Sequence, residues 1–425
     1  MVKQALWDYV AATAAVLGFY GRYVTSFDQI HPDVSRGRML PPTQHIGTLR
    51  FDGALARRFE RDYAELKEVT RRCARHSLSY PAIVSMCHAV RYLTCVAAFV
   101  APRYALLVGA LQFVVAPLSL PVAAMKLLTY APEGVLHYAL ALTLGFGGGV
   151  VLGPVVTMDG RLLACLMAVD QVANLLVYLL WSEPFGLSRL IRHAVYGTLD
   201  TKLDWLVVFG CLYGSQLDIG LTLLVGLLTL GAVNTVLPEV KAWLRVPCQH
   251  VLFYVDHRLG HLPTVYTHAH KMHHTMHDTT PWSAHAYGEG MNEHYFLMLL
   301  DILPCMLAPS LFHVPYCFSL HLLYITWTDK PSHTRLKPGT PYEIYANFHS
   351  DHHVLHTKNM ALIRGALLDF YFGSMGPTTH EAEGLSMSRR EEDGEVVIEV
   401  AQAGVTKLIQ TVTGYAVKLH MRSCL

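Results

Sequence analysis

The spacing of histidines is the feature of this sequence that could carry chemistry. Three groups occur, HRLGH at 257–261, HAHKMHH at 268–274 and HSDHH at 349–353. Histidines within them recur at i,i+4 or at i,i+3,i+4, and a helix places residues with these spacings on one face. Three helical segments could therefore aim eight imidazoles at one point: His257, His261, His270, His273, His274, His349, His352 and His353.

Eight imidazoles predict two metal ions, because they exceed the ordinary coordination of one. Imidazole nitrogen suits iron, zinc, copper and nickel. An iron pair can use O2 to remove hydrogen from an unactivated carbon, which amino-acid side chains cannot do alone. Zinc accepts the same ligands but has no redox chemistry. We interpret four isolated histidines as polar anchors or satisfied buried groups: His137, His193, His313 and His321.

The composition predicts a membrane protein. The chain has 425 residues, with 15% charged residues and a mean hydropathy of +0.30, whereas soluble domains carry about 25% charged residues. A net charge of +1 provides no basic face for nucleic acid. Nine cysteines without a CxxC pair indicate reduced thiols. Apolar segments long enough to span a bilayer lie at 89–128, 133–157, 162–181, 203–237 and 295–327, and Pro102-Arg103 and Pro117 are expected to break the first.

The predicted fold class is all-α, a polytopic membrane protein with a helical cap that carries the histidines on the cytosolic face. Basic loops beside the histidines favour that face. The run 295–327 must fold back on itself to return HSDHH to the same side, and its three prolines support this. Residues 54–78 predict a solvated, charged helix, and the apolar N-terminus predicts a first helix or an interfacial anchor.

We divide the chain into four parts. Residues 1–88 form an N-terminal anchor and polar segment, and 89–200 form additional transmembrane helices. Residues 201–376 form the catalytic domain, and 377–425 form a soluble tail.

Several motifs resemble those of the fatty acid hydroxylase / sterol desaturase superfamily of membrane di-iron enzymes. The chain contains YVDHRLGH, HAHKMHH and FHSDHHVLHTKNMALIRGALLDFYFGS, which are similar to the three histidine boxes and the closing segment of that superfamily. The run TPWSAHAYGEG at 280–290 resembles the C-5 sterol desaturase branch, although GEGMNEH replaces the branch's following His-Pro segment. The resemblance covers roughly 200–376.

The resemblance implies that the eight box histidines are metal ligands and that His333 is a ninth. It matches His285 to the histidine of the HAxHP run of the C-5 sterol desaturases, and it leaves Glu289 or Glu293 to take the polar role of the missing segment. Side chains expected to orient the ligands are Asp256, His277, His285, Glu289, Glu293, His294 and His356.

The implied function is O2-dependent oxidation of a lipid C–H bond by two iron ions, with sterol desaturation as the leading reaction. Electrons are expected from cytochrome b5 and an NAD(P)H reductase, because the chain shows no Rossmann or haem motif. The implied location is the endoplasmic reticulum membrane. A fatty-acyl or sphingoid hydroxylase and a C-4 methylsterol oxidase are alternatives within the superfamily. A histidine-rich zinc protein or transporter is an alternative of another class.

Overall fold

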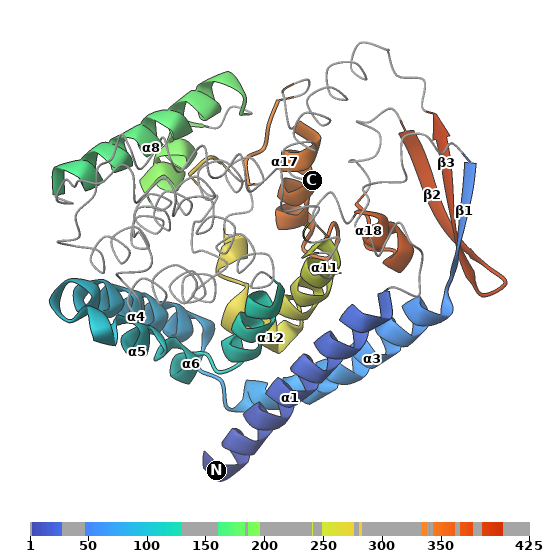
Figure 1. Cartoon of the computed structure of the whole chain (residues 1–425), viewed down its shortest axis with the longest axis horizontal. Helices are drawn as coiled ribbons and strands as arrows, with labels where there is room; N and C mark the ends of the chain where they lie inside the picture. The colour runs from blue at the N-terminus through green and yellow to red at the C-terminus, as the bar shows by residue number, and fades with distance from the viewer. Residues whose placement is uncertain are drawn as a thin grey trace.

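The computed structural model describes residues 2–27, 47–129, 160–182, 186–195, 240, 249–275, 280–282, 333–337, 340, 343–361, 366–376 and 385–402. These residues are mostly helical, which confirms the helical part of the predicted fold class (Figure 1). The predicted segments 133–157, 203–237 and 295–327 lie outside the described residues, so the fold-back of the last one stays a prediction.

The two N-terminal helices form one wall of the core. Helix α1 spans Val2–Ser26 and helix α3 spans Ala54–Arg71, and they pack along each other (Figure 1). Helix α3 is amphipathic and buries Leu55, Phe59 and Leu66. It is therefore a core helix with one charged face, and the 3-10 turn η2, Arg72–Arg75, continues it.

Aromatic rings join this wall to the helices that carry the site. Phe59 lies 5.0 Å from Phe19 of α1 and 4.6 Å from Phe372 of α18, between ring centroids. Phe372 in turn stacks on Tyr254 of α11 at 5.1 Å. Helix α11 spans Gln249–Gly260 and helix α18 spans Ala366–Phe372. The N-terminal segment and the predicted catalytic domain thus share one core.

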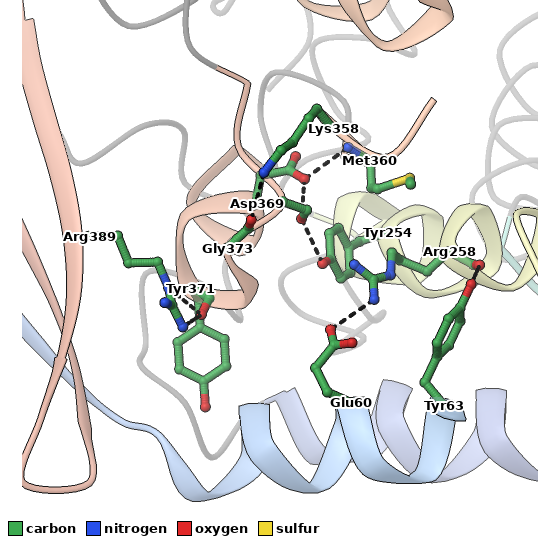
Figure 2. Close-up of polar contacts among 11 residues, drawn as sticks. Glu60, Tyr63, Tyr254, Arg258, Lys358, Met360, Asp369, Tyr371, Gly373 and Arg389 are labelled. Carbon is green, nitrogen blue, oxygen red and sulfur yellow. Dashed lines mark hydrogen bonds and ion pairs between the residues drawn. The ribbon is translucent and has the colours of Figure 1, made fainter. Parts of the chain in front are cut away.

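Charged contacts reinforce the same junction. The guanidinium of Arg258 donates to Glu60 at 2.8 Å, and the hydroxyl of Tyr63 donates to the backbone oxygen of Arg258 at 2.9 Å (Figure 2). Arg258 also lies over the rings of Phe59 and Tyr63. These contacts fix α11 against α3 one residue from His257.

The apolar region breaks at its prolines, as predicted. Helix α4 spans Tyr80–Val100, and the short segments η3 (Pro102–Tyr104), α5 (Ala105–Gly109) and α6 (Gln112–Val115) follow it. Proline lacks an amide proton and clashes with the preceding turn. Within the described residues, α4 alone is long and apolar enough to cross a membrane. Helix α8, Gly160–Leu180, matches the predicted segment 162–181.

A three-stranded antiparallel sheet joins the segment that follows α1 to the C-terminal end of the described chain. Strand β1 (Gly47–Asp52) pairs with β3 (Glu395–Gln402), and β3 pairs with β2 (Leu385–Glu392). Asp393 and Gly394 both have positive φ, 49° and 86°, which is the turn geometry that a two-residue Asp-Gly hairpin requires. The tail, predicted only as a soluble extension, thus packs Val396 and Ile398 into the main core.

Ile398→Ala should lower the free energy of unfolding by about 2–5 kcal/mol, because the truncation leaves a cavity beside the fully buried position. Chemical denaturation of the purified protein measures the change. Glu399→Ala on the exposed side of the same strand is the control, with an expected loss of about 0–1 kcal/mol for its surface ion pair with Arg390. Equal effects of both substitutions would contradict the burial of β3.

Candidate metal centre

Four short elements carry or immediately precede eight of the histidines of the site, and His333 lies in the segment 333–337. His257 lies in α11, and His261 follows the end of that helix. His270 follows helix α12 (Pro263–Ala269), and His273 and His274 lie in the 3-10 turn η4, His273–Thr275. Helix α17, Glu343–Leu355, carries the third group. Figure 1 shows α11, α12 and α17 meeting in the interior of the chain.

The predicted helical spacing is only partly realised in the local structure. His349, His352 and His353 share the α-helix α17. The first group instead runs past the end of α11, and the three ligands of the second group follow the end of α12. A single helix does not carry both groups, because Pro263 begins a new one. The amide of His261 still donates to the His257 carbonyl at 3.1 Å, so the turn keeps the two rings together.

The nine predicted ligands come together in two sets. We call the first the five-histidine set: His257, His261, His270, His274 and His352. We call the second the four-histidine set: His273, His333, His349 and His353. The ligand atoms in each set all lie within 4.8 Å of one another, so each set could hold a metal ion. The sets adjoin, since the rings of His274 and His353 are 4.6 Å apart.

The Nε2 atoms of the five-histidine set form a chain of close contacts. Nε2 of His270 lies 3.1 Å from Nε2 of both His257 and His274. Nε2 of His352 lies 3.1 Å from Nε2 of both His274 and His261. Two nitrogens bound at right angles to one ion, at about 2.1 Å each, would lie about 3.0 Å apart. The observed spacing therefore fits ligands of a shared ion.

Hydrogen bonding alone cannot explain these contacts. Nδ1 of His257 donates to the Met360 carbonyl at 2.6 Å, and Nδ1 of His352 donates to the Lys358 carbonyl at 2.7 Å. A neutral imidazole carries one proton, so Nε2 of both rings presents a lone pair. The three remaining rings can supply at most three Nε2 protons to the four contacts. At least one of the four contacts therefore lacks a hydrogen bond and brings two lone pairs or two N–H groups face to face. A cation shared by Nε2 atoms that all present lone pairs would remove this repulsion.

The four-histidine set repeats this spacing. Nε2 of His333 lies 3.2 Å from Nε2 of His273 and 3.1 Å from Nε2 of His349. Nε2 of His333 can donate to only one of these atoms if it is protonated. The ninth ligand, proposed from the resemblance alone, thus joins a set of buried imidazoles.

Burial keeps the imidazoles neutral. Desolvation lowers the pKa of the ligand histidines well below the ordinary value, and neighbouring histidines lower it further: His257, His270, His273, His274 and His349. A neutral ring is the form that coordinates a metal, because its lone pair is free to bind. The environment therefore prepares these side chains as ligands at neutral pH.

One histidine of the second group lies outside both sets. Nδ1 of His268 accepts from the Leu118 amide at 3.3 Å, so its Nε2 carries the proton and donates to the Ser77 hydroxyl at 2.8 Å. The Ser77 hydroxyl in turn donates to the Cys73 carbonyl at 2.9 Å. His268 is therefore a structural donor, in a geometry unlike that of a base that activates a serine.

Of the seven side chains predicted to orient the ligands, the structure describes His356 and Asp256. Nδ1 of His356 lies 3.2 Å from Nδ1 of His274, beside the five-histidine set. The Asp256 carboxylate accepts from Thr129 at 2.7 Å and lies 3.3 Å from the Lys126 ammonium. The contacts of His257 and His352 with backbone carbonyls were not predicted, since a sequence pattern does not specify which loop carbonyl meets a ring. The other predicted partners lie outside the described residues: His277, His285, Glu289, Glu293 and His294.

Comparison of the chain with protein-family models, with curated proteins and with solved structures found no match. The resemblance to the superfamily therefore depends on the motifs quoted above, and the site depends on its own geometry.

His273→Ala should reduce the metal content from about two ions per chain towards one, because it removes a ligand from the four-histidine set only. Elemental analysis of the purified protein measures this. His76→Ala is the control, since His76 pairs with Asp8 at 3.0 Å and belongs to neither set. Unchanged metal content in His273→Ala would contradict the assignment of this ligand.

Proposed function

We propose that this protein is a membrane enzyme that oxidises a lipid C–H bond with O2, using two iron ions held by the nine histidines. The observation that carries the proposal is the convergence of two adjoining sets of buried, neutral imidazoles. A pair of iron ions bound there would supply the oxidation of an unactivated carbon by O2. Zinc would fit the same nitrogen ligands without redox chemistry.

The residues of the chain perform the remaining tasks. The five-histidine set and the four-histidine set hold one ion each, and α17 contributes ligands to both. His257 and His352 keep their Nε2 lone pairs aimed at the site because carbonyl groups hold their Nδ1 protons. Burial of the rings excludes water from the ligand side of the centre.

A sterol is the proposed substrate, with desaturation as the reaction. This choice follows from the resemblance of TPWSAHAYGEG to the C-5 sterol desaturases. The described part of this run packs against α8, since the Trp282 indole donates to Gln171 at 2.9 Å and the Trp282 ring lies 5.9 Å from Tyr178. Hydroxylation of a fatty-acyl or sphingoid chain and C-4 methylsterol oxidation are the alternatives for the same centre.

A bilayer is the proposed source of the substrate. Helix α4 has only 33% of its most apolar window buried inside the protein. Its exposed side chains include Leu93, Val96 and Phe99, and exposed leucines continue on α8. Apolar surface of this extent is characteristic of a membrane or partner contact. We place the site on the cytosolic face of the endoplasmic reticulum, where cytochrome b5 or an equivalent reductase would supply electrons.

Removing metal with a chelator should abolish lipid oxidation, and Fe2+ but not Zn2+ should restore it, because only iron supports redox chemistry. Reconstituted protein, an electron donor and a sterol lacking the C-5 double bond provide the assay, with product identified by mass spectrometry. Restoration by zinc, or full activity without metal, would refute the oxidase.

Lipid profiling of a null mutant separates the substrates, and accumulation of a Δ7-sterol lacking the C-5 double bond is the expected result.

Leu93→Lys combined with Val96→Lys should weaken the insertion of α4 into the bilayer, because a lysine within a span costs about 2.5–3.5 kcal/mol. Protease digestion of sealed membranes, followed by immunoblotting, measures the accessibility of α4. Glu68→Lys on the exposed side of α3 is the control and should leave the accessibility of α4 unchanged. Equal accessibility of α4 in both variants would argue against contact between α4 and lipid.

A further inference from the structure

One loop supplies an outer partner to three of the five ligands in the five-histidine set. This loop, residues 356–361, follows α17. The Met360 carbonyl accepts from Nδ1 of His257 at 2.6 Å, and the Lys358 carbonyl accepts from Nδ1 of His352 at 2.7 Å. Nδ1 of His356 lies 3.2 Å from Nδ1 of His274. Loop 356–361 therefore determines the tautomers of His257 and His352 and also contacts His274.

The backbone of the loop is strained and needs anchors. His356 and Asn359 have positive φ, 48° and 52°, in a region that side chains other than glycine rarely adopt. The Asn359 amide donates to the Phe348 carbonyl at 3.0 Å and accepts from the Gly376 amide at 2.7 Å. A Cβ at Gly376 would lie 2.9 Å from the Asn359 oxygen, so this close approach requires glycine. Such strain persists where surrounding contacts enforce it.

The carboxylate of Asp369 is the central anchor. It is fully buried on α18 and accepts from the amides of Met360 at 2.8 Å and Ala361 at 2.9 Å. The Ser374 hydroxyl also donates to it at 2.6 Å. Figure 2 shows the carboxylate beside Met360, whose carbonyl holds His257. Asp369 thus positions His257 through Met360 alone. In the contacts described, Asp369 does not touch a ligand histidine itself.

The four-histidine set differs in this respect. Nδ1 of His273 and Nδ1 of His349 are buried and have no hydrogen-bond partner in the described part of the chain. Ligand histidines usually donate their second nitrogen to a carbonyl or a carboxylate, and losing such a partner weakens metal affinity about 10–100-fold. The two sets are therefore unequal in the support that they receive from the protein.

We propose that Asp369 is a positioning residue that, through loop 356–361, makes the five-histidine set the tighter of two metal sites. The inference deepens the proposed function and rests on its metal centre, but it requires neither iron nor a particular substrate. It assigns to the Asp369 carboxylate a role in metal affinity at one site and none at the other.

Titration of the metal-free, full-length protein with Zn2+ against a chelating indicator tests this. The wild-type chain should bind about two ions in two steps of different affinity. Asp369→Asn should weaken the tighter step about 10–100-fold and leave the weaker step unchanged, because an asparagine NH2 would face a backbone amide in place of an acceptor oxygen.

Two further variants keep the test decisive. Asp62→Asn removes the same charge from a carboxylate that binds Tyr23 and Arg22 without contacting a ligand, so both steps should match wild type. Ser374→Ala removes one of the three hydrogen bonds to Asp369 and should weaken the tighter step by a smaller factor, which covers the case that Asp369→Asn does not fold.

The outcomes separate the two proposals. Two unchanged steps in Asp369→Asn, or equal losses in both, would overturn the positioning role and leave the metal centre intact. A wild-type protein that binds no Zn2+ would overturn the metal centre and the positioning role together.

Discussion

The metal centre has to hold several imidazoles together although their Nε2 lone pairs converge in a buried space and repel one another. Two carbonyl groups hold the Nδ1 protons of His257 and His352, and this choice of tautomer leaves both Nε2 atoms as acceptors. Nε2 of His352 has a single lone pair but two neighbouring nitrogens at 3.1 Å, so its contacts cannot both be hydrogen bonds. An arrangement that is unfavourable for the isolated rings becomes favourable around a cation. The surrounding core therefore has to enforce the arrangement.

Packing far from the histidines provides that enforcement. Phe59 and Phe372 link α3 to α18, and Tyr254 links α18 to α11. The same α18 carries Asp369, which holds loop 356–361 under the ligands. The N-terminal helices, which lie outside the region of the resemblance, thus support the site through α11 and α18. The aromatic contacts and the Asp369 carboxylate hold loop 356–361 in place. The loop in turn contacts the rings of His257, His274 and His352.

The sequence predicted correctly those features that depend on residue type and spacing within a short segment. Histidine spacing predicted which side chains would gather, and the proline positions predicted the breaks after α4 and α6. The sheet was missed although EEDGEVV contains an Asp-Gly hairpin signal, because β1 and β3 are more than 340 residues apart. A single sequence carries no direct record of pairing over such a distance. The helical form expected for the first two histidine groups also failed, because α11 and α12 end within them.

Residue type and spacing were thus sufficient to identify eight candidate ligands and to predict two ions, since eight imidazoles exceed the coordination of one. The ninth, His333, came from the family resemblance. Only the folded chain divided these ligands into sets of five and four, and only it placed Met360 and Lys358 against particular rings. The physical reason is that ligand chemistry belongs to the side chain, whereas the partition and the tautomers depend on backbone atoms. Every residue has the same carbonyl group, so its position is decided by packing.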